Sequence, residues 1–244
     1  MSGKLRIFVL LPLLLAGAVQ AHAQLESKYI RNLPQVDNQR WHFGFILGIG
    51  LGDFTTLPSE WTDANGNSYY SASNGLMPAF MVGMIADLRL CEYLNLRCTP
   101  YLTLGERRLN YTCFTPRGAQ IGDPTQVSVK PTTVDVPFYL KYSGKRYGNV
   151  RPYILAGGGP QFNINLNPEE PILLNVFDVQ IGFGVGLMIY NEYFRFCPEL
   201  KFCFGLLDQL NRNHPEIDDT PYEVYTRSLD RLTSRMLAIT FNFE

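Results

Sequence analysis

Hydrophobic and polar residues alternate with a period of two in eight stretches of this 244-residue chain. In one of them, Phe177, Val179 and Ile181 share one face while Asp178 and Gln180 share the other. Such alternation is typical of β-strands whose two faces meet different surroundings. The predicted strands lie near 41–50, 78–90, 94–104, 133–142, 150–159, 177–190, 194–206 and 235–243.

Charged residues fall on only one face of these predicted strands. The apolar faces carry none, which suits contact with lipid, whereas the opposite faces carry ten and would line an interior. We expect these side chains to form an ion-pair network inside a barrel. The ten residues are Asp87, Arg89, Arg97, Asp135, Lys141, Arg151, Asp178, Arg195, Glu199 and Lys201.

Short and long connections alternate along the chain. Short turns follow the second, fourth and sixth strands, and long polar segments follow the first, third, fifth and seventh. This is the pattern of an outer-membrane barrel with short periplasmic turns and long external loops. The predicted external loops span about 51–76, 105–132, 160–176 and 207–234.

The fold predicted from these patterns is all-β, an eight-stranded antiparallel up-and-down transmembrane β-barrel. Hydrocarbon cannot satisfy an open strand edge, so the sheet must close on itself. Eight strands enclose a space just wide enough for side chains to fill. We therefore expect a filled polar lumen rather than a pore.

The N-terminus predicts export. Lys4 and Arg6 precede an apolar run over 7–19, and Ala21-His22-Ala23 forms a small-x-small cleavage site. We expect a signal peptide over 1–23, with an uncleaved anchor helix as the alternative. A periplasmic N-terminal segment over 24–40 and the barrel over 41–244 would follow, which places the protein in the outer membrane of a Gram-negative cell.

Composition excludes several classes of protein. The formal net charge of −1 argues against a general nucleic-acid binder, which needs a basic excess. Outside the N-terminus no apolar run approaches the about 18 residues of a membrane-spanning helix, which excludes a helical bundle. The mean hydropathy of −0.06 resembles that of a soluble chain, because lipid-facing and lumen-facing residues cancel in the average.

Cysteine usage predicts packing rather than chemistry. The chain has five cysteines, an odd number, and no C-x-x-C pair. That is a poor basis for a disulfide framework or a zinc site. We expect Cys91, Cys98, Cys113, Cys197 and Cys203 to act as small apolar side chains.

Two histidines carry the main candidate chemistry of the exported chain. His42 could be a general base, but a histidine at the periplasmic rim that bonds to the turn region is the favoured interpretation. His214 lies among loop acids that could bind a divalent cation loosely, although their spacing is not that of a calcium loop. These acids are Asp208, Glu216, Asp218, Asp219 and Glu223.

No catalytic residue, metal site or cofactor is expected. The glycine-rich stretches at 48–52 and 182–186 lie on strands with no helix after them, so they do not predict a phosphate loop. Aromatic residues of the external loops could form a protein-binding patch or an interfacial girdle. They are Trp61, Tyr69, Tyr70, Tyr111, Phe114 and Tyr222.

The chain ends on an aromatic strand of the kind that outer-membrane assembly machinery recognises, except that the last residue is Glu244.

A block before and within the first strand resembles the N-terminal signature of the PorT-like family of outer-membrane proteins from Bacteroidetes. Further stretches at 134–142, 151–159, 177–179 and 198–201 are similar to that family, so the resemblance covers most of the exported chain. The residues of the block that carry it are Asn32, Leu33, Pro34, Asp37, His42, Phe43, Gly44 and Phe45.

The resemblance implies a role in the type IX secretion system, which exports proteins with a C-terminal signal domain, including proteases and adhesins that act as virulence factors. Family members are needed for this export without being its conduit, and the family has no catalytic residues to carry over. It implies that the partners are outer-membrane lipid and other secretion proteins, with no nucleic acid and no small-molecule substrate. The block over 32–45 is then the candidate docking motif.

The sequence leaves three functions open. The favoured one is a non-enzymatic accessory component of type IX secretion. The second is a generic structural or adhesive outer-membrane barrel. The third and least favoured is a lipid-modifying enzyme, because small barrels host all three kinds of function.

Overall fold

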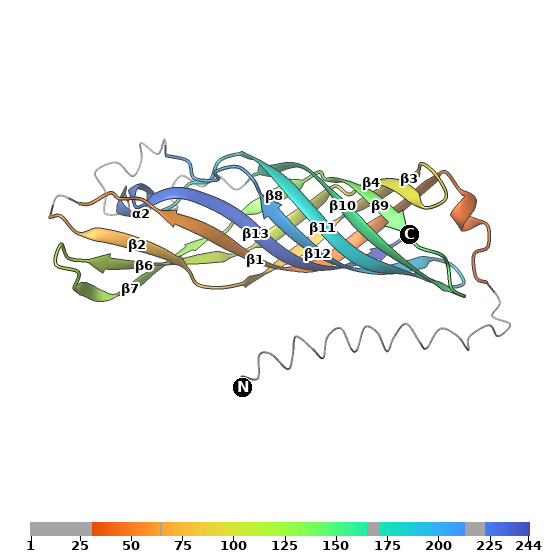
Figure 1. Ribbon diagram of the computed structural model, residues 1–244, viewed down its shortest axis with the longest axis horizontal. Helices are drawn as coiled ribbons and strands as arrows, with labels where there is room; N and C mark the ends of the chain where they lie inside the picture. The colour runs from red at the N-terminus through yellow and green to blue at the C-terminus, as the bar shows by residue number, and fades with distance from the viewer. Residues whose placement is uncertain (1–30, 64, 165–170, 213–222) are drawn as a thin grey trace, which may run out of the picture.

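Eight strand positions close into a ring in the computed structural model, which describes residues 31–63, 65–164, 171–212 and 223–244. The first of these positions pairs antiparallel with both the second and the last, which completes the ring. Figure 1 shows the strands crossing the tube obliquely. Six positions are single strands, namely β1 (Trp41–Pro58), β3 (Met77–Arg89), β10 (Val150–Asn163), β11 (Phe177–Tyr190), β12 (Arg195–Gly205) and β13 (Leu229–Phe243).

Two positions of the ring are each shared by two short strands. They are β4 (Leu94–Cys98) with β5 (Tyr101–Gly105), and β8 (Thr132–Asp135) with β9 (Phe138–Ser143). Each break contains a proline, which has no N–H to donate to a neighbouring strand. The breaks lie side by side, since the Thr99 N–H donates to the carbonyl oxygen of Pro137 at 3.2 Å. The eight predicted strand positions are thus confirmed, with two of them interrupted.

The predicted faces are also confirmed. Outward side chains are apolar and lie on the surface that would contact lipid. For example, Phe80 is 67% exposed and Val185 is 54% exposed. Inward side chains such as Asp87 and Arg97 are fully buried. No helix among the described residues is long and apolar enough to cross a membrane.

The apolar band on β1 has the height of a bilayer core. It runs from Trp41 to Leu51, and at about 3.3 Å per residue and a tilt of about 40° this stretch spans roughly 25 Å of membrane. Asp53 follows and pairs with Arg235 of β13 at 2.6 Å. Because the Arg235 side chain is half exposed on the outer wall, this ion pair marks the external edge of the band.

The wall continues beyond the membrane. Strands occupy much of the predicted loops at 51–76 and 105–132, so the prediction of loops there is wrong. Beyond its membrane part, β1 runs on to Pro58, and a second sheet follows the order β2-β6-β7. Its strands, at the left in Figure 1, are β2 (Ser68–Ser73), β6 (Arg107–Phe114) and β7 (Gln120–Val129). Alternation in Leu109-Asn110-Tyr111 and in Val127-Ser128-Val129 was the signal for these strands.

The other two predicted loops are also shorter than expected. Strand β10 extends to Asn163, and β13 begins at Leu229 after the short helix α2 (Glu223–Arg227). Residues 165–170 and 213–222 of these loops lie outside the described residues.

An apolar cluster occupies the external end of the tube, so the predicted polar lumen does not extend to that end. Phe54 and Leu232 are fully buried in it, and burial raises the pKa of the Tyr111 hydroxyl. The lumen is therefore charged only in its membrane part. The cluster comprises Phe54, Leu109, Tyr111, Val127, Val129, Ile172, Leu174, Leu210, Leu229 and Leu232.

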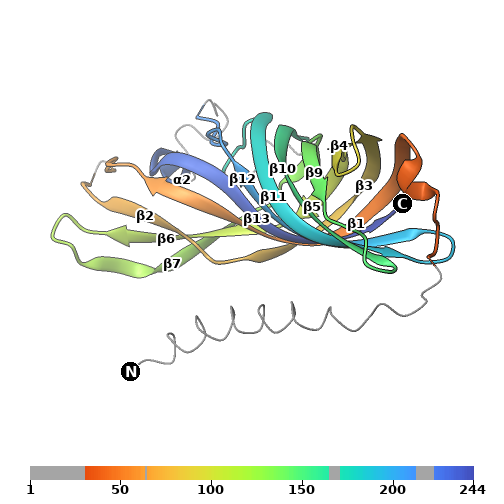
Figure 2. The same cartoon turned by 45° about the vertical axis from the view of Figure 1, so that its right-hand side comes forward.

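The segment before β1 lies at the opposite end, beside the C-terminus (Figure 2). It contains the short 3-10 helix η2 (Val36–Asn38). The predicted signal peptide over 1–23 and the first part of the predicted periplasmic segment, 24–30, lie outside the described residues. The short turns share this end, which is therefore the periplasmic one.

A charge placed on the outer wall tests the assignment of inside and outside. We expect Val185→Arg, near the middle of β11, to destabilise the barrel by about 2–4 kcal/mol. The measurement is urea unfolding in lipid vesicles, with Gln126→Arg on the exposed external sheet as the control. An unchanged unfolding free energy for Val185→Arg would contradict contact between this face and lipid.

Candidate functional site

Arg97 is the centre of a buried ion-pair network in the lumen. Its Nε lies 2.9 Å from Asp87 Oδ2, and its Nη1 lies 3.3 Å from Glu199 Oε2. Its Nη2 pairs with Glu244 Oε1. The side chains of all four residues are fully shielded from solvent, so one guanidinium contacts three buried carboxylates from different parts of the wall.

Three further cations complete the network. Lys141 pairs with Asp87, Lys201 Nζ lies 2.6 Å from Glu199 Oε1, and Arg195 Nη2 lies 2.6 Å from Glu244 Oε2. Four cations and three carboxylates therefore share this part of the lumen. A buried ion must be paired to offset its loss of hydration, and here every carboxylate has at least two cationic partners.

The structure brings six of the ten predicted lumen charges into this network and places the other four elsewhere. Asp135 accepts hydrogen bonds from the hydroxyls of Thr103 and Thr133, and no cation pairs with it among the described residues. Asp178 accepts from the amide of Gln209 at 2.7 Å. The remaining two, Arg89 and Arg151, lie at the periplasmic mouth.

Glu244 is a network member that the sequence reasoning missed. In the sequence pattern it is visible only as a departure from an aromatic C-terminal strand. Its main chain pairs with Arg195 in both directions, which aligns it with the wall. The alternation of β13, with Thr240 and Asn242 facing inward, was the signal that could have placed Glu244 in the lumen.

Arg107 was also missed, because it lay in a predicted loop. Its side chain is buried, with the guanidinium carbon 4.5 Å from the centre of the Phe54 ring. No carboxylate pairs with it among the described residues. It lies beside the external apolar cluster, at the point where the charged lumen ends.

The lumen is packed rather than open. A Cβ on Gly186 would lie 2.4 Å from the Tyr153 ring, so this glycine makes room for an aromatic side chain from the neighbouring strand. Two cavities, one near each end of the tube, each measure about 10 Å³, which is room for about one water molecule. Neither of these two cavities has space for a solute larger than water.

The first part of the candidate docking motif packs against the periplasmic end of the barrel itself. The Asn32 N–H donates to Asn149 Oδ1 at 3.0 Å, and its side-chain amide donates to the Tyr190 carbonyl at 3.1 Å. Asp37 accepts a hydrogen bond of 2.6 Å from the Tyr190 hydroxyl. Arg146 stacks on the Tyr190 ring and pairs with Asp37 at 3.3 Å.

Leu33 packs against a buried cluster of the lumen, whereas Pro34 is exposed.

The second part of the motif belongs to the wall. His42 Nε2 donates to the carbonyl oxygen of Val36 at 2.8 Å, as favoured for a rim histidine. Phe43 and Phe45 face outward and are 70% and 52% exposed. Gly44 is required because a Cβ there would lie 2.2 Å from the carbonyl oxygen of Phe243.

The remaining candidate groups are distributed over the two ends and the wall. All five cysteines are free thiols. Of the acids near His214, Asp208 pairs with Arg212, while Glu223 pairs with Arg227. His214, Glu216, Asp218 and Asp219 lie outside the described residues.

The external aromatics form contacts in pairs. Tyr70 lies edge-on to Phe114 with ring centres 5.5 Å apart, and Trp61 lies 6.4 Å from Tyr69. Tyr111 contacts Tyr225 in the external cluster. Tyr222 lies outside the described residues.

A closed ring with an apolar outer band, a packed charged interior and its short turns at one end defines an integral outer-membrane β-barrel protein. The chain belongs to the family described as outer membrane protein beta-barrel domain, whose model matches residues 22–211. The protein therefore resides in the outer membrane, with its long connections on the cell surface.

Two further comparisons add little to this assignment. The crystal structure of the outer membrane protein OprG from Pseudomonas aeruginosa is similar at a TM-score of 0.36 and 8% sequence identity, over 82% of this chain and 93% of that one. No curated protein matches the sequence.

Removal of the central cation tests the network. We expect Arg97→Ala to destabilise the barrel by about 3–5 kcal/mol, because Asp87, Glu199 and Glu244 lose a shared buried partner. Urea unfolding in lipid vesicles measures the change. The matched control is Arg108→Ala, which breaks a half-exposed pair with Glu106 and should cost at most about 1 kcal/mol. Equal effects of the two variants would argue against a buried network.

Proposed function

We propose that this barrel is a non-enzymatic accessory component of the type IX secretion system, needed for export of proteins with a C-terminal signal such as proteases and adhesins. The observation that carries the proposal is the resemblance of the block over 32–45 to the PorT-like signature. The family match by itself shows that the chain is an outer-membrane barrel protein.

The packing of the lumen supports an accessory role rather than that of a conduit. Arg97, Lys141 and Lys201 are buried among their partners in the membrane part of the tube, and apolar side chains fill the external end. An exported protein cannot pass through such an interior. The surfaces of the barrel are then what partner proteins contact.

The periplasmic end supports a docking role for only part of the motif. Asn32, Leu33 and Asp37 contact the barrel itself, whereas Pro34 and Gln35 are exposed at its mouth. In this proposal the barrel holds the segment in a fixed shape, and the exposed residues meet other secretion proteins. No catalytic residue or cofactor is part of the proposal.

An adhesive or structural barrel is the alternative function. The observation in its favour is the ordered external sheet, which displays Tyr70 at 54% exposure beside Phe114. Aromatic side chains on a rigid surface suit protein recognition. A lipid-modifying enzyme has no comparable observation in its favour.

Deletion of the gene separates the two functions. We expect proteins with the C-terminal signal to accumulate unprocessed in the periplasm, because their export lacks an essential component. Immunoblots of periplasmic and surface fractions measure this, with restoration by the wild-type gene as the control. Normal export together with altered adhesion would instead support the adhesive barrel.

Crosslinking tests the docking surface directly. A photoreactive residue at Gln35 should yield adducts with other secretion proteins, because this side chain is exposed at the periplasmic mouth. The same residue at Arg117, on the external hairpin, is the matched control and should give none of these adducts. Identical adducts from both positions, or none from Gln35, would contradict docking at the mouth.

A further inference from the structure

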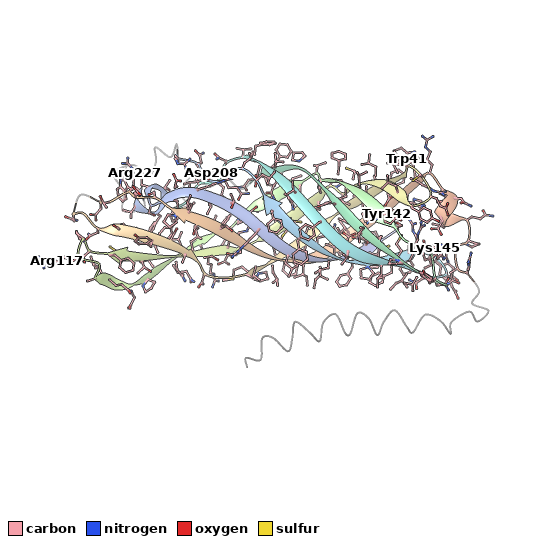
Figure 3. The ribbon with its side chains drawn as sticks, viewed as in Figure 1. Trp41, Arg117, Tyr142, Lys145, Asp208 and Arg227 are labelled. Atoms are coloured by element: carbon pink, nitrogen blue, oxygen red, sulfur yellow. The ribbon has the colours of Figure 1, made fainter. Side chains whose placement is uncertain are left out.

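A small cavity lies at the periplasmic mouth, and three of the four cations that line it are ion-paired, Lys141 with Asp87, Arg151 with Asp37 and Arg195 with Glu244. Four cationic side chains and two anionic ones line it, together with neutral groups. Figure 3 marks this end of the tube with Trp41, Tyr142 and Lys145. The charged residues of the lining are Arg89, Lys141, Arg151, Arg195, Asp37 and Glu92.

Arg195 lines this cavity and has a donor that its ion pair does not use. Its side chain is only 4% exposed, and its Nη2 is engaged by Glu244. Its Nε has no hydrogen-bond partner among the described residues. A buried donor without an acceptor is costly, so Arg195 keeps hydrogen-bonding capacity that Glu244 does not satisfy.

Arg89 is a second cation with unmet capacity. Its guanidinium reaches only neutral oxygens, the carbonyl of Cys91 at 3.3 Å and the side chain of Asn38 at 3.5 Å. In the described part of the chain no carboxylate lies within ion-pair distance of it. A carboxylate at the mouth would supply the missing countercharge.

The size of the cavity limits what can enter. Its volume of about 10 Å³ admits one oxygen-sized atom. A sugar or a complete phosphate group is too large. One oxygen of a carboxylate fits, with the rest of the group outside at the rim, where the side chain of Glu92 is exposed and that of Arg89 is half-buried.

The surrounding face is also basic. Arg31, Arg40 and Lys145 are exposed at this end, against Glu92 and Glu192. A chain with several carboxylates would therefore meet favourable charge beyond the cavity as well. A single free anion would gain none of this additional attraction.

We propose that the periplasmic mouth is a binding site for an acidic peptide segment of a periplasmic protein, with one Asp or Glu carboxylate held by Arg195 and Arg89. The site stands on its own geometry and does not depend on a role in secretion. The expected partner has an exposed run of carboxylates on a flexible chain.

Peptide binding by the full-length protein in detergent micelles tests the site. The probe is a fluorescent glycine-serine peptide that carries several glutamates, and the control peptide has glutamine at the same positions. Fluorescence anisotropy should show binding of the glutamate peptide alone, weakening as sodium chloride is raised. Free acetate at the same carboxylate concentration should not displace it.

Three variants assign the binding to the mouth. Arg89→Gln should weaken binding roughly tenfold, the factor expected for loss of one charge-assisted hydrogen bond. Glu92→Gln removes an anion from the lining and should tighten binding, a gain that a loss of folding cannot produce. Arg117→Gln, at the opposite end of the tube, should leave binding unchanged.

Equal binding of the two peptides, displacement by acetate, or an effect of Arg117→Gln equal to that of Arg89→Gln would each overturn the proposal. Because the assay uses purified protein, such a failure leaves the proposed role in export untouched. Conversely, normal export in the deletion strain would leave the peptide site standing.

Discussion

Hydrocarbon offers no hydrogen bond to a peptide group, and this constraint determines the shape of the molecule. Strand β1 must therefore pair on both sides, with β3 and with β13, and the sheet becomes a ring. Eight strand positions give a narrow ring, so its interior is filled by side chains instead of solvent. The packed lumen therefore follows from closure of the ring.

A narrow interior that contains charge needs internal compensation. Arg97 supplies it by contacting Asp87, Glu199 and Glu244, which come from different parts of the wall. Burying so many ions does not by itself stabilise a fold, because their lost hydration offsets much of their attraction. The network instead makes the removal of any one partner costly, and this favours a single arrangement of the strands around it.

The two ends of the tube are built differently, and this difference bears on function. The external end is a sheet over an apolar cluster, while the segment over 31–40 packs against the periplasmic end. Contacts of Asn32 and Asp37 with the barrel fix the segment and leave Gln35 exposed. In the docking role proposed above, the periplasmic mouth offers a surface fixed by these contacts, which lowers the entropy lost on binding.

The sequence by itself determined the eight strand positions of the membrane ring, their faces and the compartment, because lipid on one side and packed polar groups on the other impose a period of two that is visible locally. It also identified Asp87, Arg97 and Glu199 as interior charges. Only the tertiary structure decided which of them meet, why Asp135 lies apart, and that Glu244 closes the network. Those contacts depend on the register of strands around the ring, and residues as distant in sequence as Arg97 and Glu244 become neighbours only when the ring closes.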